Sequence, residues 1–81
     1  MYTVYVLKDN LKRLYKGVTN NLVRRIKEHR SGQTKTTSRM KDIEIAYTET
    51  YNSFEEARKR EIYLKTAAGR RFLKFIKNIR P

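Results

Sequence analysis

The chain has 81 residues, of which 20 are Lys or Arg and 8 are Asp or Glu, and its formal net charge is +12 at pH 7. Positive charge of this density is typical of proteins that bind a polyanion, most often nucleic acid. With no cysteine and one histidine, the sequence excludes disulfides, thiolate catalysis, cysteine-based zinc sites and the HExxH type of metal centre. No apolar run approaches the ~18 residues of a membrane span. We therefore expect a cytoplasmic protein with no membrane partner and one domain, residues 1–81.

The first half of the chain predicts two strands and a helix. Residues 1–8 alternate with the period of a strand, placing Tyr2, Val4 and Val6 on one face and Thr3, Tyr5 and Leu7 on the other. Asp9 and Asn10 predict a turn, so residues 13–18 should form an antiparallel partner strand. A helix is expected over residues 21–31, with N-cap candidates before it and Gly32 at its end; those candidates are Thr19, Asn20 and Asn21.

The inward stripe of that helix has an unusual composition. Its members follow the i, i+3, i+4, i+7 spacing of one helix face, and they are Leu22, Arg25, Ile26 and His29. Two of the four are polar, and a buried guanidinium without partners is costly. The mixture indicates a surface that binds something negative.

The second half predicts one more strand and two helices. Residues 33–42 are polar and basic, and we interpret them either as a loop suited to phosphate contacts, through hydroxyls such as Thr34 and Thr37, or as a solvated connector. Residues 43–51 alternate as a third strand, with Ile43, Ile45 and Tyr47 expected on one face. Residues 70–79 predict a packed basic helix.

A capping box at Ser53 and Glu56 predicts a helix from there to about residue 65. Its buried stripe is expected to contain Phe54, Ala57, Glu61 and Leu64. Glu61 is the anomaly, because it is an acid in the middle of an apolar face.

Several short motifs occur in a fixed order along the chain. TVY occupies residues 3–5 and YKG residues 15–17; Arg25 follows eight residues after Gly17, His29 four after that, and Glu61 lies in EARKREIYLK. This ordered set resembles the GIY-YIG nuclease superfamily, and most of all its small stand-alone bacterial members. The resemblance spans essentially the whole chain. It implies an α+β fold in which a small three-stranded antiparallel sheet is flanked by helices.

The resemblance also implies a metal-dependent DNA endonuclease that uses one divalent cation, Mg²⁺ or Mn²⁺. Position by position, Tyr5 and Tyr15 match the tyrosines of the two motifs, and Arg25 matches the catalytic arginine. His29 matches a position held by His or Tyr, and Glu61 matches the metal-binding glutamate. Thr3-Val4 stands where the family name has Gly-Ile, and Lys16 where it has Ile. Asn78 is the one candidate for a supporting late asparagine.

Phosphodiester hydrolysis accounts for these residue types independently of the family. One carboxylate, Glu61, suffices to hold Mg²⁺ when waters and the phosphate fill the remaining positions. Arg25 presents a planar fork to the phosphate oxygens. Tyr5 is our expected general base, aided by His29 or Tyr15, provided that nearby cations lower its pKa. All five side chains should then converge on one concave surface.

Six further cations are expected to contact nucleic acid: Lys16, Arg24, Lys35, Arg39, Lys41 and Arg58. The expected partner is DNA, including branched, nicked or flapped forms, and RNA is not excluded.

A non-catalytic DNA- or RNA-binding module with the same fold is the alternative function, and a ribosomal or other RNA-binding protein is a third. Each site residue also has a structural interpretation. The tyrosines would be ordinary sheet aromatics, His29 a hydrogen-bonded helix-face histidine, and Arg25 with Glu61 a structural salt bridge.

Overall fold

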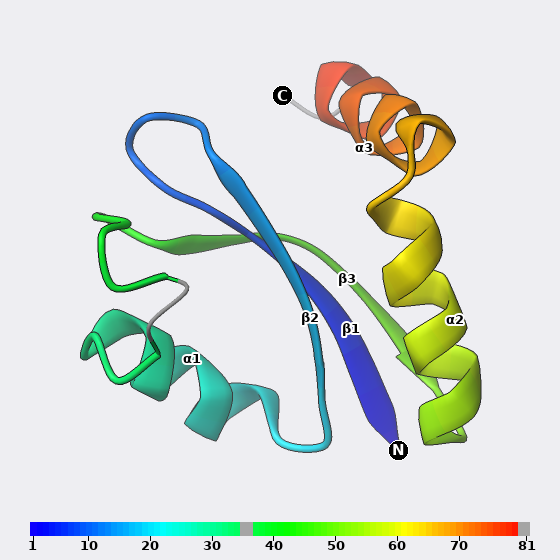
Figure 1. Ribbon diagram of the computed structural model, residues 1–81, viewed down its shortest axis with the longest axis horizontal. Helices are drawn as coiled ribbons and strands as arrows, with labels where there is room; N and C mark the ends of the chain where they lie inside the picture. The colour runs from blue at the N-terminus through cyan, green and yellow to red at the C-terminus, as the bar shows by residue number, and fades with distance from the viewer. Residues whose placement is uncertain (35–36, 80–81) are drawn as a thin grey trace.

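A computed structural model describes residues 1–34 and 37–79, with the side chains of residues 77–79 left out. The elements follow the order β1 (Tyr2–Lys8), β2 (Leu14–Thr19), α1 (Leu22–Arg30), β3 (Glu44–Tyr51), α2 (Phe54–Leu64) and α3 (Ala67–Ile79) (Figure 1). The α+β class predicted from the sequence is confirmed. Within the described residues, no helix has both the length and the apolar character needed to cross a membrane.

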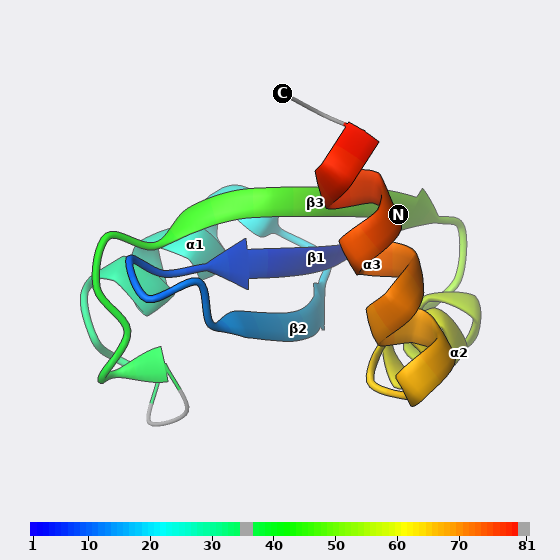
Figure 2. The same cartoon turned by 90° about the horizontal axis from the view of Figure 1, so that it is seen from above.

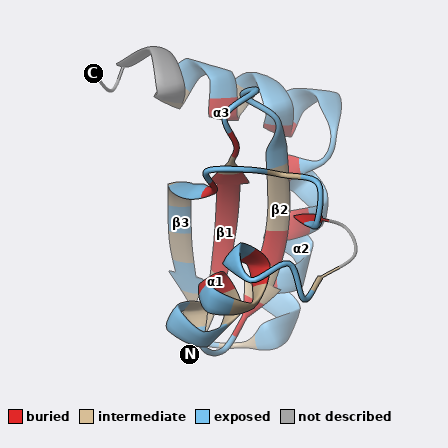
Figure 3. Ribbon diagram, turned by 90° about the vertical axis from the view of Figure 1, so that its left-hand side faces the viewer, coloured by how far each residue is buried: buried red, intermediate tan, exposed pale blue. Residues whose placement is uncertain are grey.

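The three strands form one antiparallel sheet in the order β2-β1-β3. Figure 2 shows β1 between the other two, and Figure 3 shows it as the most buried strand. In the β1–β2 register, Tyr5 lies opposite Gly17 and Leu7 lies opposite Tyr15. β2 is therefore an edge strand. The YKG motif lies on this strand, and the TVY motif lies on β1 beside it.

Helices cover both faces of the sheet, with α1 on one face and α2 and α3 on the other (Figure 1). Tyr5 and Leu7 pack with Ile26 of α1, while Val4 and Val6 pack with Leu64 of α2 and with α3. The alternation predicted for residues 1–8 is confirmed, and it divides the core into two layers.

The face assignment predicted for β3 is wrong beyond Ile45. The register shifts between Val6 and Leu7, so that Tyr47 pairs with Val6 but Ile45 pairs with Leu7. This bulge adds a residue to β3 and reverses the faces. Ile43 packs on the α1 side and Tyr47 on the α2 and α3 side, while Ile45 is 45% exposed.

Capping side chains define the starts of α1 and α2. Of the three N-cap candidates for α1, Asn21 is the one used: its side-chain oxygen accepts from the backbone N–H of Arg24 at 3.1 Å. The predicted N-cap at Ser53 is confirmed, because Ser53 Oγ accepts from the N–H of Glu56 at 3.2 Å, and the Glu56 carboxylate turns back to the Ser53 hydroxyl. Gly32 follows the end of α1 with φ of +77°, which favours glycine.

The basic tail helix begins at Ala67, three residues earlier than predicted. Thr66 Oγ1 accepts from the backbone N–H of Gly69 at 3.1 Å, as an N-cap does. A Cβ on Gly69 would overlap the carbonyl oxygen of Tyr63 and the Cα of Leu64. Gly69 thus permits a tight corner between α2 and α3.

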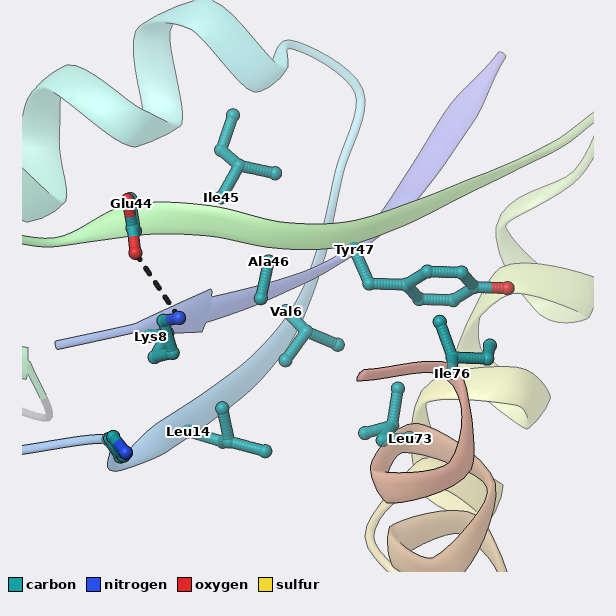
Figure 4. A pocket seen from close by; sticks show the side chains of 10 residues that line it. Val6, Lys8, Leu14, Glu44, Ile45, Ala46, Tyr47, Leu73 and Ile76 are labelled. Carbon is teal, nitrogen blue, oxygen red and sulfur yellow. Dashed lines mark ion pairs between the residues drawn. The ribbon is translucent and has the colours of Figure 1, made fainter. Parts of the chain in front are cut away.

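A cavity of about 460 Å³ lies between the turn end of the hairpin and α3. Figure 4 shows Leu73 and Ile76 of α3 beside Val6 and Tyr47, with the Lys8–Glu44 ion pair at the other end of the cavity. Apolar and charged side chains both line it, and none of the five predicted catalytic residues does.

Candidate active site

Four of the five predicted catalytic side chains line one cleft of about 220 Å³ at the β2 edge: Tyr5, Tyr15, Arg25 and Glu61. Arg25 belongs to α1 and Glu61 to α2, which cover opposite faces of the sheet. Their side chains meet because the cleft crosses the edge strand at Gly17 and Val18. The fifth residue, His29, lies behind Tyr5 and does not line the cleft.

Gly17 is what lets the Tyr5 ring lie against β2. A Cβ at residue 17 would lie 2.5 Å from the Tyr5 hydroxyl oxygen and 2.6 Å from Cζ. Any side chain there would displace the tyrosine, so the glycine of the YKG motif has a steric role at the site.

Three aromatic rings from three elements pack together at and behind the cleft. The Tyr5 ring centroid lies 6.3 Å from that of Tyr15 and 5.8 Å from that of His29, and Tyr15 and His29 are 5.0 Å apart. The Tyr5 hydroxyl is 3.0 Å from His29 Nε2, within hydrogen-bond distance. Both tyrosines and the histidine are therefore parts of one packed group.

The other side of the imidazole is held by two threonine hydroxyls. His29 Nδ1 lies 2.7 Å from Thr37 Oγ1 and 2.9 Å from Thr34 Oγ1, and the two hydroxyls are 2.7 Å apart. Thr37 does not serve the surface phosphate role considered for residues 33–42, because it is fully buried. The half-buried Thr34 directs its hydroxyl to His29 and Thr37. The sequence offered only a dense run of hydroxyl residues, which does not reveal which of them point inward.

His29 favours the neutral state. Burial and the nearby Arg25 cation lower the pKa of His29, and Glu28 opposes this effect only in part. In a neutral imidazole, one ring nitrogen donates a hydrogen bond and the other accepts one. Donation from Nδ1–H to the threonine hydroxyls leaves Nε2 free to accept from Tyr5.

Arg25 is held by its own helix. Its Nη1 donates to Glu28 Oε1 at 2.9 Å. Hydrogen bonding to Tyr5 and to Glu28 raises the pKa of Arg25 above its ordinary value, so the guanidinium stays charged. Glu28, which the sequence reasoning did not single out, thus orients the arginine at the cleft.

The pKa of Tyr5 moves in the direction opposite to the one expected. Burial raises it, and the hydrogen bond from Arg25 lowers it by less. Tyr5 is therefore a protonated phenol at neutral pH in the metal-free chain, and Arg25 alone does not make it a base.

Glu61 is 7% exposed, and its carboxylate faces two cations. Oε1 accepts from Arg58 at 2.5 Å, and Oε2 is 3.1 Å from Lys65 Nζ. The structural salt bridge considered between Arg25 and Glu61 is wrong, because each residue pairs with a neighbour on its own helix or at its end.

The donor set around Glu61 suits a hard cation held mainly by substrate and water. No group of three His, Cys, Asp or Glu side chains converges anywhere in residues 1–34 and 37–79. Mg²⁺ and Mn²⁺ accept one or two protein carboxylates when phosphate oxygens and waters complete the shell. A buried carboxylate that lines the cleft fits that requirement.

The six cations predicted to contact nucleic acid do not share one location. Arg58 lines the cleft, and Arg24 lines an adjoining one of about 290 Å³ together with Arg25 and Glu28. Lys41 lines a third cleft beyond α1. Arg39 is exposed, and its carbonyl accepts from Arg13 Nη2 at 3.2 Å. Lys35 lies outside the described residues.

Lys16 lies in a cationic cluster that the sequence did not predict. It is half-buried on β2, and burial together with the charges of Arg70 and Lys65 lowers its pKa. Among the ion pairs of the described residues, none joins Lys16 or Arg70 to a carboxylate. Three cations from β2, the end of α2 and the start of α3 thus lie near enough to act on one another, and one of them, Lys65, contacts Glu61.

An α+β domain with paired tyrosines, an arginine and a buried glutamate at one cleft has the features of a nuclease domain. The known family described as the GIY-YIG catalytic domain matches residues 1–74, and the chain belongs to this family. GIY-YIG nucleases act on DNA and generally use a divalent metal.

The relatives are small proteins of similar length. The chain is 38% identical over 77 residues to a UPF0213 protein of Clostridium perfringens, covering 94% of this chain and 83% of that one. It is 36% identical over 74 residues to a UPF0213 protein of Staphylococcus epidermidis, covering 90% of each. A solution NMR structure of the UPF0213 protein BH0048 from Bacillus halodurans matches with a TM-score of 0.58 and 31% identity, covering 95% of this chain and 86% of that one.

Proposed function

We propose that this chain is a metal-dependent endonuclease that hydrolyses DNA phosphodiester bonds at the β2-edge cleft. The observation that carries the proposal is the meeting of Tyr5, Tyr15, Arg25 and Glu61 in one cleft, with His29 hydrogen-bonded to Tyr5 from behind. The net charge of +12 favours a phosphate polymer as the substrate.

Arg25 binds the scissile phosphate. Its guanidinium lies at the cleft, stays charged and is oriented by Glu28. It offers donors to the non-bridging oxygens and stabilises the negative charge that increases on them in the transition state.

Tyr5 and His29 form a proton relay that activates water. The attacking water gives its proton to the Tyr5 oxygen while the phenolic proton passes to His29 Nε2, 3.0 Å away. The water oxygen forms its bond to phosphorus as the bond to the leaving oxygen breaks, and solvent protonates that oxygen. The relay explains how a phenol with a raised pKa takes part, because no free phenolate has to accumulate.

Tyr15 and the two threonines keep the relay in place. Tyr15 packs against both partners of the relay, and the hydroxyls of Thr34 and Thr37 supply acceptors for a proton on His29 Nδ1. When the proton arrives at Nε2, both imidazolium N–H groups already have acceptors.

Glu61 is the carboxylate of the cleft that would hold Mg²⁺ or Mn²⁺. When bound, the cation neutralises phosphoryl charge and stabilises the leaving oxygen. Arg58 and Lys65 contact the Glu61 carboxylate in the metal-free chain, and either side chain would be available to a DNA phosphate if Glu61 held the metal instead.

The test compares Glu61→Gln with Glu55→Gln, which changes an exposed carboxylate on the same helix. Cleavage of linear, nicked, branched and flapped DNA is measured with Mg²⁺ and with Mn²⁺, alongside thermal melts and binding in metal-free buffer. We expect Glu61→Gln to abolish cleavage while fold and binding persist, and Glu55→Gln to cleave normally. Arg25→Ala should lose cleavage and part of the binding.

Two outcomes would overturn the proposal. Undiminished cleavage by folded Glu61→Gln would remove the metal-ligand role. Binding without cleavage of any of these substrates by the wild-type chain would favour the non-catalytic module instead.

A further inference from the structure

Phe54 differs from every other residue of the stripe predicted to be buried on α2. Ala57, Glu61 and Leu64 are buried, whereas Phe54 is 51% exposed. Its position is fixed, because Ser53 caps α2 immediately before it and its ring packs edge-on against Tyr2 at 5.6 Å and 68°. One side of the ring is thus anchored, and about half of the residue faces solvent.

The ring lies between two clefts. Phe54 lines the β2-edge cleft with Arg58 and Glu61, and also the adjoining cleft with Arg24. Arg25 lines both clefts as well. A nucleotide chain whose phosphate is held by Arg25 therefore passes within reach of an exposed aromatic surface.

We propose that Phe54 stacks against the base of a nucleotide next to the scissile phosphate, which makes DNA with an unpaired nucleotide at that point the preferred substrate. This inference rests on the proposed function and specifies its substrate class. An aromatic face binds any base through stacking, with little dependence on sequence. A base inside a duplex is already stacked on both sides, so it must leave the helix to reach the ring, and unpaired bases do so at least cost.

A purely structural role for Phe54 makes a different prediction. If the ring only anchors α2 to β1 through Tyr2, its loss lowers the melting temperature and affects all DNA forms alike. Phe54→Leu separates the two roles, because leucine retains an apolar contact to Tyr2 but offers no flat surface to a base. Phe54→Tyr retains both the contact to Tyr2 and the flat aromatic surface.

The matched control is Phe75→Leu, which changes a 63% exposed phenylalanine on α3 that lines neither cleft. Affinities are measured in metal-free buffer for a flapped DNA, a single strand and the matching unbroken duplex. We expect Phe54→Leu to weaken binding to the flap and the single strand by about 10-fold and to leave duplex binding nearly unchanged. Phe54→Tyr and Phe75→Leu should bind as the wild type does.

A base analogue whose fluorescence reports unstacking, placed on either side of the cleavage point, provides a second readout. With the wild type its signal should change at one position only, and Phe54→Leu should abolish the change. Equal weakening on all three DNA forms, or no weakening on any, would overturn the stacking proposal. If cleavage still depends on Glu61 in that case, the endonuclease proposal stands; if the wild type binds none of the DNA forms, both proposals fail.

Discussion

Tyr5 and Gly17 lie opposite each other on β1 and β2, and the tyrosine occupies the space that a side chain at residue 17 would need. Gly17→Ala should therefore displace the Tyr5 hydroxyl from His29. We expect a loss of about 1–3 kcal/mol in the free energy of unfolding from overpacking. Cleavage should fall about 10²-fold, because a shift of about 1 Å in a reacting group has that effect.

Gly32→Ala is the matched control for that experiment. Gly32 has φ of +77° and nothing within 4 Å of a Cβ built on it, so alanine there costs about 1–2 kcal/mol through backbone strain alone. Thermal melts of the two variants should be similar, and only Gly17→Ala should cleave slowly. Equal cleavage rates for the two folded variants would mean that the position of Tyr5 does not matter.

The single histidine gives the stability of the fold a defined pH dependence. Burial lowers the folded-state pKa of His29 below its ordinary value of about 6.5. As the pH falls through about 6.5, the unfolded chain takes up a proton that the folded chain resists, so stability decreases. The melting temperature should fall between about pH 7 and pH 5, above the range where carboxylates titrate.

His29→Gln serves as the reference for that experiment, because it has no titrating group at residue 29. Its melting temperature should be nearly constant across the same pH interval, whatever its absolute value. A wild-type curve parallel to the variant's would show that His29 is protonated as easily in the folded chain as in the unfolded one.

The Thr37 hydroxyl does not line the cleft, but its loss should still slow cleavage. Thr37→Val retains the shape of the side chain but removes the 2.7 Å contact to His29 Nδ1, leaving Thr34 to hold the tautomer. We expect a loss of about 1 kcal/mol in stability. The cleavage rate should fall by less than in Tyr5→Phe, which breaks the relay itself and should lose about 10²-fold or more.

Thr37→Ser, which keeps the hydroxyl, should restore cleavage. Thr50→Val, at an exposed position on β3, should leave both stability and cleavage nearly unchanged. Full activity of Thr37→Val would exclude the positioning role and leave Thr37 as a core residue only.

Local sequence rules predicted the elements well because the relevant interactions are local. The alternation on β1 and the caps at Asn21 and Ser53 each depend on neighbours within a few residues, and all were confirmed. The bulge in β3 was missed because it depends on pairing with a distant strand, and a single extra residue sends Ile45 and Tyr47 to opposite faces.

The site was predictable in its residue types but not in its supporting contacts. A helical period placed Phe54 in the buried stripe of α2, but the period does not reveal that the packing leaves about half of this residue uncovered. The inward turn of Thr37 and the close approach at Gly69 likewise depend on tertiary packing. The sequence did not reveal how far Tyr5 is buried, so it did not show that burial outweighs the effect of Arg25 on the pKa of Tyr5.

The Lys16, Lys65 and Arg70 cluster should account for a measurable part of the salt dependence of DNA binding. Like charges held close together favour a bound anion, because a phosphate relieves their mutual repulsion. For the wild type we expect ~4 to 7 neutralised phosphates and a slope of log affinity against log salt near −0.9 per phosphate. Lys16→Gln and Arg70→Gln should each reduce the magnitude of the slope by about 1.

Lys59→Gln is the comparison, because Lys59 is an exposed cation of α2 that lines none of the clefts described above. Its slope should stay near that of the wild type. The loss at Lys16 should be the same for duplex and flapped DNA, because phosphate contacts carry no information about base pairing. An unchanged slope in both cluster variants would mean that DNA does not pass over this corner of the protein. A flat salt response of the wild type would contradict nucleic-acid binding altogether.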